Sequence, residues 1–313
     1  MPGDFSPVKW GEGMGQSNET IVIAGAGLMG TGIAHAFASS GFATVLVDTN
    51  PAALARARED IAAILGTGVK LGKLAEADAK AAGERLSVST DLVASCRGAR
   101  LFIETVSEQL AVKKAVVAEA QPVLAPDAVI ASNTSALSVT EIATAVTCPD
   151  RVIGMHFFNP VHKMKLVELV MGLDTSEATI ARARDYARAI GKTSIVVNET
   201  PGLTTSRMSA MLGNEAMYML LEGTASAEDI DTALRLGLNH PMGPLELGDM
   251  TGWDTRLAVL KYLHQTLGER FRPCPLIIKM VASGRIGRKA GRGVYVYEGG
   301  QRVPGSGLKA HAL

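Results

Sequence analysis

The sequence predicts an α/β fold, in which a doubly wound, mainly parallel sheet is followed by a smaller all-α domain. Apolar strand patterns alternate with alanine-rich helix patterns over the first half of the chain. A glycine-rich turn separates the first strand from the first helix, and the pattern is helical almost throughout beyond Pro201. A length of 313 residues also favours two domains over one.

The domain boundaries follow from changes in this pattern. Residues 1–18 hold six glycines or prolines and no apolar periodicity, so we expect a flexible leader there. We expect the sheet domain over residues 19–201 and the all-α domain over residues 202–313.

The sheet domain opens with a βαβ unit, ETIVIAGAG, LMGTGIAHAFASSG and ATVLVD. After an alanine- and charge-rich stretch from Pro51 to Gly83 come SVSTD, ARLFIET, a helix over Glu108 to Gln121, and the strand AVIASN. These strands read as buried on both faces, as in a parallel sheet.

Beyond Pro149 the spacing changes. RVIGMHFFNP and MKLVELVMG are two apolar runs joined by a short loop, and TSIVVNET follows a predicted helix over Glu177 to Ile190. They extend the sheet in partly antiparallel fashion. The second domain holds the helical segments MSAMLGNEAMYMLLEG, SAEDIDTALRLG, GWDTRLAVLKYLHQTLG and PLIIKMVASG.

Composition limits the class of partner. Lysine plus arginine and aspartate plus glutamate both total 31, so no overall field draws the chain to nucleic acid or an anionic membrane. No apolar run reaches the roughly 18 residues of a membrane span. The balanced charge therefore predicts a small or locally charged partner, here a small-molecule substrate. Three cysteines without metal-ligand spacing favour reduced thiols in a cytoplasmic protein and no metal site.

The glycine turn, Gly25-Ala26-Gly27-Leu28-Met29-Gly30, fits GxGxxG between a strand and a helix. Gly25 permits the tight turn, Gly27 lets the backbone approach a pyrophosphate, and Gly30 allows close packing of helix on strand. The helix N-terminus then favours phosphate charge, and Leu28 and Met29 complete the turn. The whole is a Rossmann-type dinucleotide site.

Asp48 ends the second strand, 18 residues after Gly30, where a carboxylate binds ribose hydroxyls. The same charge repels a 2′-phosphate, and the next residues are Thr49 and Asn50 rather than arginine, so the cofactor is expected to be NAD rather than NADP. The alternative for Asp48 is a turn or helix-capping residue.

His156 and Glu168 are the candidate catalytic pair. His156 closes a strand in GMHFFNP, and Glu168 lies within the apolar run KLVELV, where an unpaired carboxylate is costly. If the two runs pair, Glu168 can reach His156, fix its tautomer and stabilise the imidazolium that forms when it takes a hydroxyl proton. The alternative is a core histidine beside an unrelated glutamate.

Beyond these residues the chain resembles the L-3-hydroxyacyl-CoA dehydrogenases, and among them the short bacterial 3-hydroxybutyryl-CoA dehydrogenases. The resemblance covers about Ile21 to Tyr297. Its motifs are IVIAGAGLMGTGIA, FIETVSEQLAVKK, ASNTSALSVTEIA, MHFFNPVHKMKLVELV, ETPGLTTSRM, HPMGPLELGDMTGWDT and GRIGRKAGRGVY.

The resemblance implies that His156 is the general base or acid and Glu168 its partner. Ser135 would bind the substrate oxygen and touch the nicotinamide, with Asn159 helping to orient both. Glu108 and Lys113 resemble ribose-side cofactor contacts, and Lys289 one from the second domain. Each has an alternative: Ser135 as a helix cap, Asn159 as a turn residue, and Lys113 and Lys289 as solvated charges.

One position departs from the family pattern. Where PGFxxNR usually places asparagine, this chain has Ser206 in PGLTTSR, and a hydroxyl clamps a substrate carbonyl less directly than an amide. Asn214 lies two turns further on and reads as a helix-packing residue. Arg56, Arg58, Lys70 and Lys73 are candidates for coenzyme A phosphates, but a solvated basic face explains them as well.

The first long helix of the second domain is apolar on more than one face, with Met208, Met211, Met217, Met219, Leu220 and Leu221. One face can pack internally and the other against a second copy. The resemblance likewise implies a homodimer through this domain.

Three functions are therefore to be compared: NAD-dependent oxidation of a 3-hydroxyacyl-CoA, the same chemistry on a carrier-protein thioester or free hydroxy acid, and a non-catalytic NAD-binding protein. Ser206 motivates the second. The set of Ser135, His156 and Glu168 opposes the third.

Overall fold

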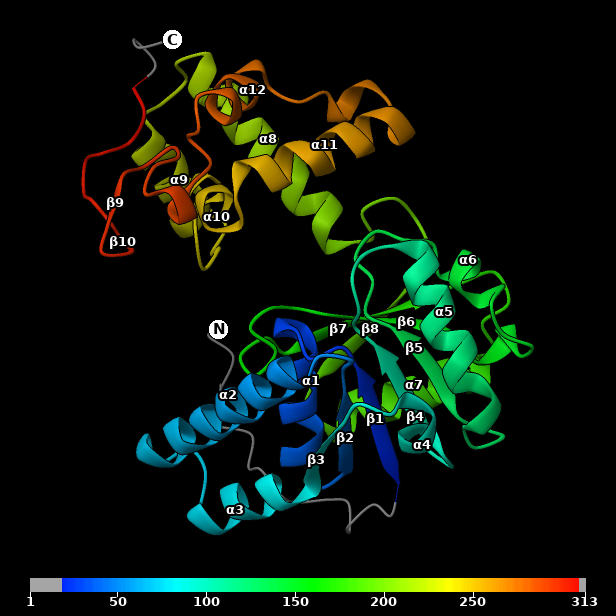
Figure 1. Cartoon of the computed structure of the whole chain (residues 1–313). Coiled ribbons are helices and arrows are strands. Elements are labelled where there is room, and N and C mark those ends of the chain that lie inside the picture. Colours follow the sequence, from blue (N-terminus) through cyan, green and yellow to red (C-terminus); the bar gives the residue numbers. More distant parts are fainter. Residues whose placement is uncertain (1–18, 310–313) are drawn as a thin grey trace. The chain divides into compact units, whose positions relative to one another are not determined.

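The computed structural model in Figure 1 describes residues 19–309, so the predicted leader over residues 1–18 lies outside the described residues. The chain divides into two compact units, Met1–Glu199 and Thr200–Leu313. The boundary expected at residue 201 lies just after this division.

The first unit is built on one eight-stranded sheet with the order β3-β2-β1-β4-β5-β6-β7-β8. Its strands are β1 (Thr20–Ala24), β2 (Ala43–Val47), β3 (Leu86–Ser89), β4 (Leu101–Glu104), β5 (Val129–Ser132), β6 (Val152–Phe157), β7 (Leu166–Met171) and β8 (Thr193–Asn198). Only β6 and β7 pair antiparallel, because the loop over residues 158–165 is too short for a crossover. The predicted mainly parallel sheet with a partly antiparallel extension is confirmed.

Helices cover both faces of this sheet (Figure 1). They are α1 (Leu28–Ser39), α2 (Pro51–Lys70), α3 (Glu76–Arg85), α4 (Leu92–Cys96), α5 (Leu110–Ala120), α6 (Val139–Ala143) and α7 (Glu177–Ala189). α1 and α7 share one face, where the rings of Phe37 and Tyr186 lie 6.4 Å apart, and α4, α5 and α6 cover the other. The strand order reverses beside β1, and such a switch point is where open α/β sheets bind ligands.

The second unit packs helices around an apolar core that includes Met217, Leu220, Trp253 and Leu260. The helices are α8 (Thr205–Leu221), α9 (Ala227–Gly237), α10 (Pro244–Thr251), α11 (Trp253–Leu267) and α12 (Pro275–Ala282). Short 3-10 helices also occur in the chain, at η1 (Gln121–Val123), η2 (Pro149–Arg151), η3 (Glu269–Phe271) and η4 (Arg288–Ala290).

The second unit is helical but not all-α. A two-stranded ladder joins β9 (Tyr297–Glu298) to β10 (Gln301–Arg302). Its turn is Gly299-Gly300, both with positive φ (56° and 78°), which is the conformation that tight hairpins demand. Strands of two residues are too short to show a periodic apolar pattern.

Candidate active site

The glycine turn has the geometry that a dinucleotide needs. Gly25 has a φ of 105°, and a Cβ on Gly30 would lie 1.8 Å from the carbonyl oxygen of Gly25, so helix and turn touch backbone to backbone. A Cβ on Gly27 would instead have nothing within 4 Å, which leaves the start of α1 open to a phosphate. The glycine turn therefore fits the pyrophosphate of the NAD expected from the sequence.

Asp48 lies beside this turn. Its Oδ2 accepts a hydrogen bond from the Ala26 N–H at 2.7 Å, and its Oδ1 accepts one from the Asn50 N–H at 2.8 Å. The cap of α2 is Asn50, whose side chain accepts from the Ala52 N–H, so Asp48 is not the helix cap. Its carboxylate is half-buried and retains lone pairs for ribose hydroxyls.

His156 and Glu168 are in direct contact. The antiparallel register of β6 and β7 places them opposite one another, and His156 Nδ1 lies 2.7 Å from Glu168 Oε2. Glu168 is 0% exposed and His156 is 7% exposed. Because a carboxylate only accepts, it selects the tautomer with the proton on Nδ1 and leaves Nε2 as the acceptor. The side-chain pairing predicted from the sequence is confirmed.

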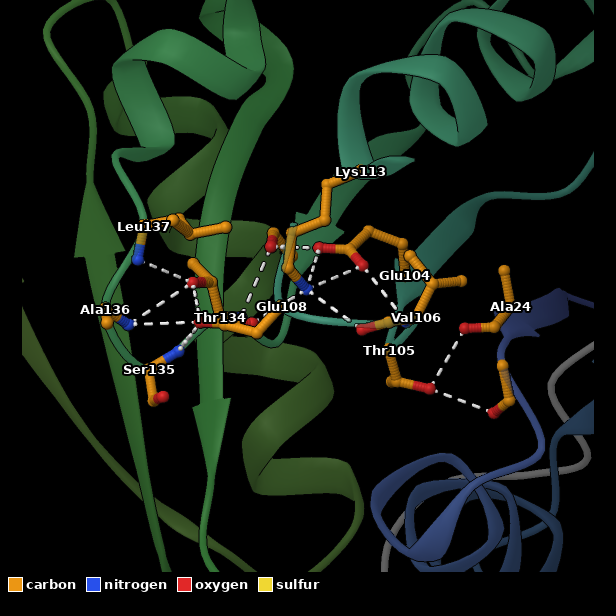
Figure 2. A network of polar contacts seen from close by, with 12 residues as sticks. Ala24, Glu104, Thr105, Val106, Glu108, Lys113, Thr134, Ser135, Ala136 and Leu137 are labelled. Atoms are coloured by element: carbon orange, nitrogen blue, oxygen red, sulfur yellow. Dashed lines mark hydrogen bonds and ion pairs between the residues drawn. The ribbon is translucent and has the colours of Figure 1, made fainter. Parts of the chain in front are cut away.

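The loop over residues 133–138, called here the Ser135 loop, follows β5 and is held by Glu108 (Figure 2). Glu108 Oε1 accepts hydrogen bonds from the Thr134 hydroxyl at 2.5 Å, the Ser135 N–H at 3.0 Å and the Ala136 N–H at 3.3 Å. Burial raises the pKa of Glu108, but the Thr134 hydroxyl and Lys113 outweigh it and leave the pKa below its usual range. Ser135 is exposed, and the cap of α6 is Ser138, so the helix-cap alternative for Ser135 is wrong.

Lys113 is not a solvated charge. Its side chain is 1% exposed, and its Nζ lies 3.0 Å from Glu104 Oε2 and 3.2 Å from Glu108 Oε2. Figure 2 shows it between the two carboxylates. Burial raises the pKa of Glu104, and Lys113 and the Ser132 hydroxyl offset only part of that rise. The sequence reasoning missed Glu104, although a glutamate ending the apolar strand LFIE, like Glu168 in its own strand, needs a buried partner.

The loop between β6 and β7 carries Asn159, which is exposed and precedes a cis proline. Lys192, the residue before β8, holds this loop in place, because its Nζ donates to the carbonyls of Val161 at 2.7 Å and Met164 at 2.6 Å.

His35 on α1 lies near the same loop, since the centroid of its ring is 6.2 Å from that of His162. Burial, then His162 and Lys192, lower the pKa of His35 to about 4.

The second unit holds the other two predicted site residues. Ser206 is half-buried in the first turn of α8. Lys289 is exposed, and its Nζ lies 2.7 Å from Asp254 Oδ2. Asn214 packs within the unit, since its amide donates to the Arg272 carbonyl and accepts from the Cys274 N–H, so it is confirmed as a packing residue.

Comparison with known proteins decides the family. Residues 20–200 match the NAD binding domain of 3-hydroxyacyl-CoA dehydrogenase, and residues 202–297 match its C-terminal domain. The chain belongs to the 3-hydroxyacyl-CoA dehydrogenase family. It is an NAD-dependent oxidoreductase, as the resemblance of its motifs predicted.

Several relatives in this dehydrogenase family are similar over nearly the whole chain. A probable 3-hydroxybutyryl-CoA dehydrogenase of Bacillus subtilis is 43% identical over 279 residues, 89% of this chain and 97% of the relative. The crystal structure of (S)-3-hydroxybutyryl-CoA dehydrogenase from Ralstonia eutropha aligns with a TM-score of 0.85 at 42% identity, covering 90% of this chain and 99% of that one. The mitochondrial hydroxyacyl-coenzyme A dehydrogenase of Sus scrofa is 36% identical over 288 residues, 89% of this chain and 91% of the relative.

Between residues 19 and 309, no helix has the length and apolar character needed to cross a bilayer. Over the same residues, no group of three His, Cys, Asp or Glu side chains is placed to hold a metal ion.

Proposed function

We propose that this dehydrogenase oxidises the 3-hydroxyl of a short 3-hydroxyacyl-CoA reversibly, with His156 as general base and Glu168 as its partner. The contact of 2.7 Å between the two buried side chains carries the proposal. The similarity to 3-hydroxybutyryl-CoA dehydrogenases supports a short acyl chain.

His156 acts through Nε2. Its Nδ1–H is donated to Glu168, so the Nε2 lone pair accepts the hydroxyl proton of the substrate as the C3–H bond breaks. The imidazolium then carries its charge against the Glu168 carboxylate, which stabilises it. In the reverse direction the imidazolium returns the proton to the 3-keto oxygen. NAD, when bound, supplies the acceptor for the hydride.

The remaining predicted residues hold the reactants. The turn from Gly25 to Gly30 and Asp48 would bind the adenosine half of the cofactor. Glu108 is exposed and would contact the ribose, with the buried Lys113 behind it at 3.2 Å. Ser135 donates its hydroxyl to the substrate oxygen, and Asn159 orients substrate and nicotinamide beside it. Lys289 stays a predicted cofactor contact.

Ser206 favours a second candidate function with the same chemistry. A hydroxyl in place of the family's amide needs a bridging water to reach the substrate carbonyl. In the second candidate function the acyl group is therefore bound to a carrier protein, or is a free hydroxy acid, instead of being bound to coenzyme A. Rates of NADH oxidation should be compared for acetoacetyl-CoA, a carrier-bound acetoacetyl group and free acetoacetate, with native enzyme and Ser206→Asn. Turnover of acetoacetyl-CoA but of neither other substrate supports the proposed acyl-CoA dehydrogenase. Turnover of the carrier-bound group or of free acetoacetate, without activity on any acyl-CoA, overturns it.

We also propose a homodimer through the second unit and a cytoplasmic location. Met208 is 55% exposed and Leu212 is 37% exposed, one turn apart on the outer side of α8. Burying both against a second copy would remove apolar surface from water. The three cysteines are free, as expected of a reducing compartment.

A further inference from the structure

Glu104 is a charged side chain with no exposed surface, at the carboxyl end of β4. Its Oε1 accepts from Lys113 Nζ at 3.1 Å and from the Ser132 hydroxyl. Its Oε2 accepts from Lys113 Nζ at 3.0 Å and from the Val106 N–H at 3.2 Å. A carboxylate has about four acceptor positions, so the protein itself fills those of Glu104 and leaves none for a ligand.

Lys113 links the Glu104 carboxylate to that of Glu108. Its Nζ, fixed by Glu104, also lies 3.2 Å from Glu108 Oε2. The other oxygen of Glu108 accepts from the Ser135 loop, including the Ser135 N–H at 3.0 Å. Figure 2 shows the chain of contacts from Glu104 through Lys113 and Glu108 to the loop. A second link joins the same ends, because the Thr134 N–H donates to the Ser132 hydroxyl that binds Glu104.

We propose that Glu104 is a positioning residue for the dehydrogenase reaction, which holds Lys113 and Glu108 so that the Ser135 loop stays in place. The inference rests on the proposed function, in which Ser135 binds the substrate oxygen. Without the Glu104 carboxylate, Glu108 is the one counterion left to the buried ammonium of Lys113 among residues 19–309. Glu108 then follows Lys113, and the loop loses the acceptor that fixes the Ser135 backbone.

A neighbouring contact separates this effect from loss of the glycine turn. The Thr105 hydroxyl lies 2.9 Å from the carbonyl oxygens of both Ala24 and Gly25, and the Thr105 N–H donates to that of Ala24 at 2.7 Å. These bonds do not involve the Glu104 charge. The phosphate-binding turn should therefore keep its shape when Glu104 becomes neutral.

The test is a double-mutant cycle with Glu104→Gln, Lys113→Met and the paired variant. We expect kcat for acetoacetyl-CoA reduction to fall about 10- to 100-fold in Glu104→Gln, because a displacement of about 1 Å costs on that order. The amide of Glu104→Gln keeps an oxygen that can accept from the Ser132 hydroxyl, so the second link remains and the variant tests the path through Lys113. The paired variant should then have the kcat of Lys113→Met alone. The paired variant buries no unpaired charge and so should fold even where Glu104→Gln is unstable.

Asp127→Asn is the matched control. It removes a carboxylate from ion pairs with Arg100 and Arg182 next to the starts of β4 and β5, the ends opposite Glu104. Its kcat should stay native. The inference is overturned if the losses of kcat in the two single variants multiply in the paired variant. It is also overturned if Glu104→Gln folds and keeps the native kcat.

Failure of the proposed function is distinguishable. If the native enzyme does not reduce acetoacetyl-CoA, the same cycle is read in NADH affinity by fluorescence, since Glu108 is the proposed ribose contact and Lys113 holds it. A paired variant that binds NADH as weakly as Lys113→Met alone then still supports the role of Glu104. A paired variant in which the two single losses of affinity multiply overturns it.

Discussion

The contact between His156 and Glu168 predicts a large catalytic effect from a small change, Glu168→Gln. The amide keeps the volume and an oxygen that can accept the Nδ1–H, so the structural cost is small. What it removes is the charge opposite a forming imidazolium, at a site where Glu168 is 0% exposed and 2.7 Å from the ring. Opposite charges about 4 Å apart interact by about 4 kcal/mol at an effective dielectric constant of about 20.

That energy corresponds to a factor of about 10³ in rate, of which the amide dipole recovers part, so we expect kcat to fall about 10²- to 10³-fold. The KM for acetoacetyl-CoA should change little, because the lost interaction forms only as the ring takes the proton. NADH absorbance gives both constants, NADH fluorescence gives cofactor affinity, and thermal unfolding confirms the fold. A folded Glu168→Gln enzyme with kcat within about threefold of native would refute the reasoning.

Three further predictions concern the turn, acid stability and assembly. Gly27→Ala should fold normally but bind NADH at least about 10-fold more weakly, because its Cβ occupies only the space for the pyrophosphate. Gly30→Ala should in addition lose about 1–3 kcal/mol of stability, because its Cβ meets the Gly25 backbone. Equal melting temperatures for the two variants would contradict this. Burial lowers the pKa of His35 to about 4, so between pH 6.5 and 4 the unfolded chain binds the proton that the folded chain does not, and stability falls as the pH falls. Denaturant unfolding of His35→Gln should show a loss over this interval smaller by up to about 3 kcal/mol, and an identical pH dependence would count against it. Met208→Glu combined with Leu212→Glu should convert a dimer to a monomer in analytical ultracentrifugation, with an unchanged dimer as the opposing result.

The pairing of His156 with Glu168 could be predicted because it depends on local rules. Two apolar runs separated by a short loop can pair only antiparallel, and a carboxylate inside such a run requires a partner. The glycine turn followed the same logic, since the φ of 105° at Gly25 and the backbone contact at Gly30 are what the motif demands.

The Glu104–Lys113 pair could not be predicted in the same way. Lys113 lies on α5, in a segment where lysines ordinarily face water, and only the packing of that helix against the end of β4 buries it. The same limit applied to α10, where a short helix between Gly243 and Gly252 has too few residues to show a periodic pattern. Tertiary packing, rather than local preference, fixes both features.

The central claim is that the His156 imidazole moves the substrate proton. The most direct measurement compares acetoacetyl-CoA reduction by native enzyme and His156→Gln at saturating NADH, with NADH affinity determined for both. The account predicts unchanged cofactor affinity and a kcat lower by about 10²- to 10⁴-fold. A His156→Gln enzyme that binds NADH and turns over at the native rate would contradict it.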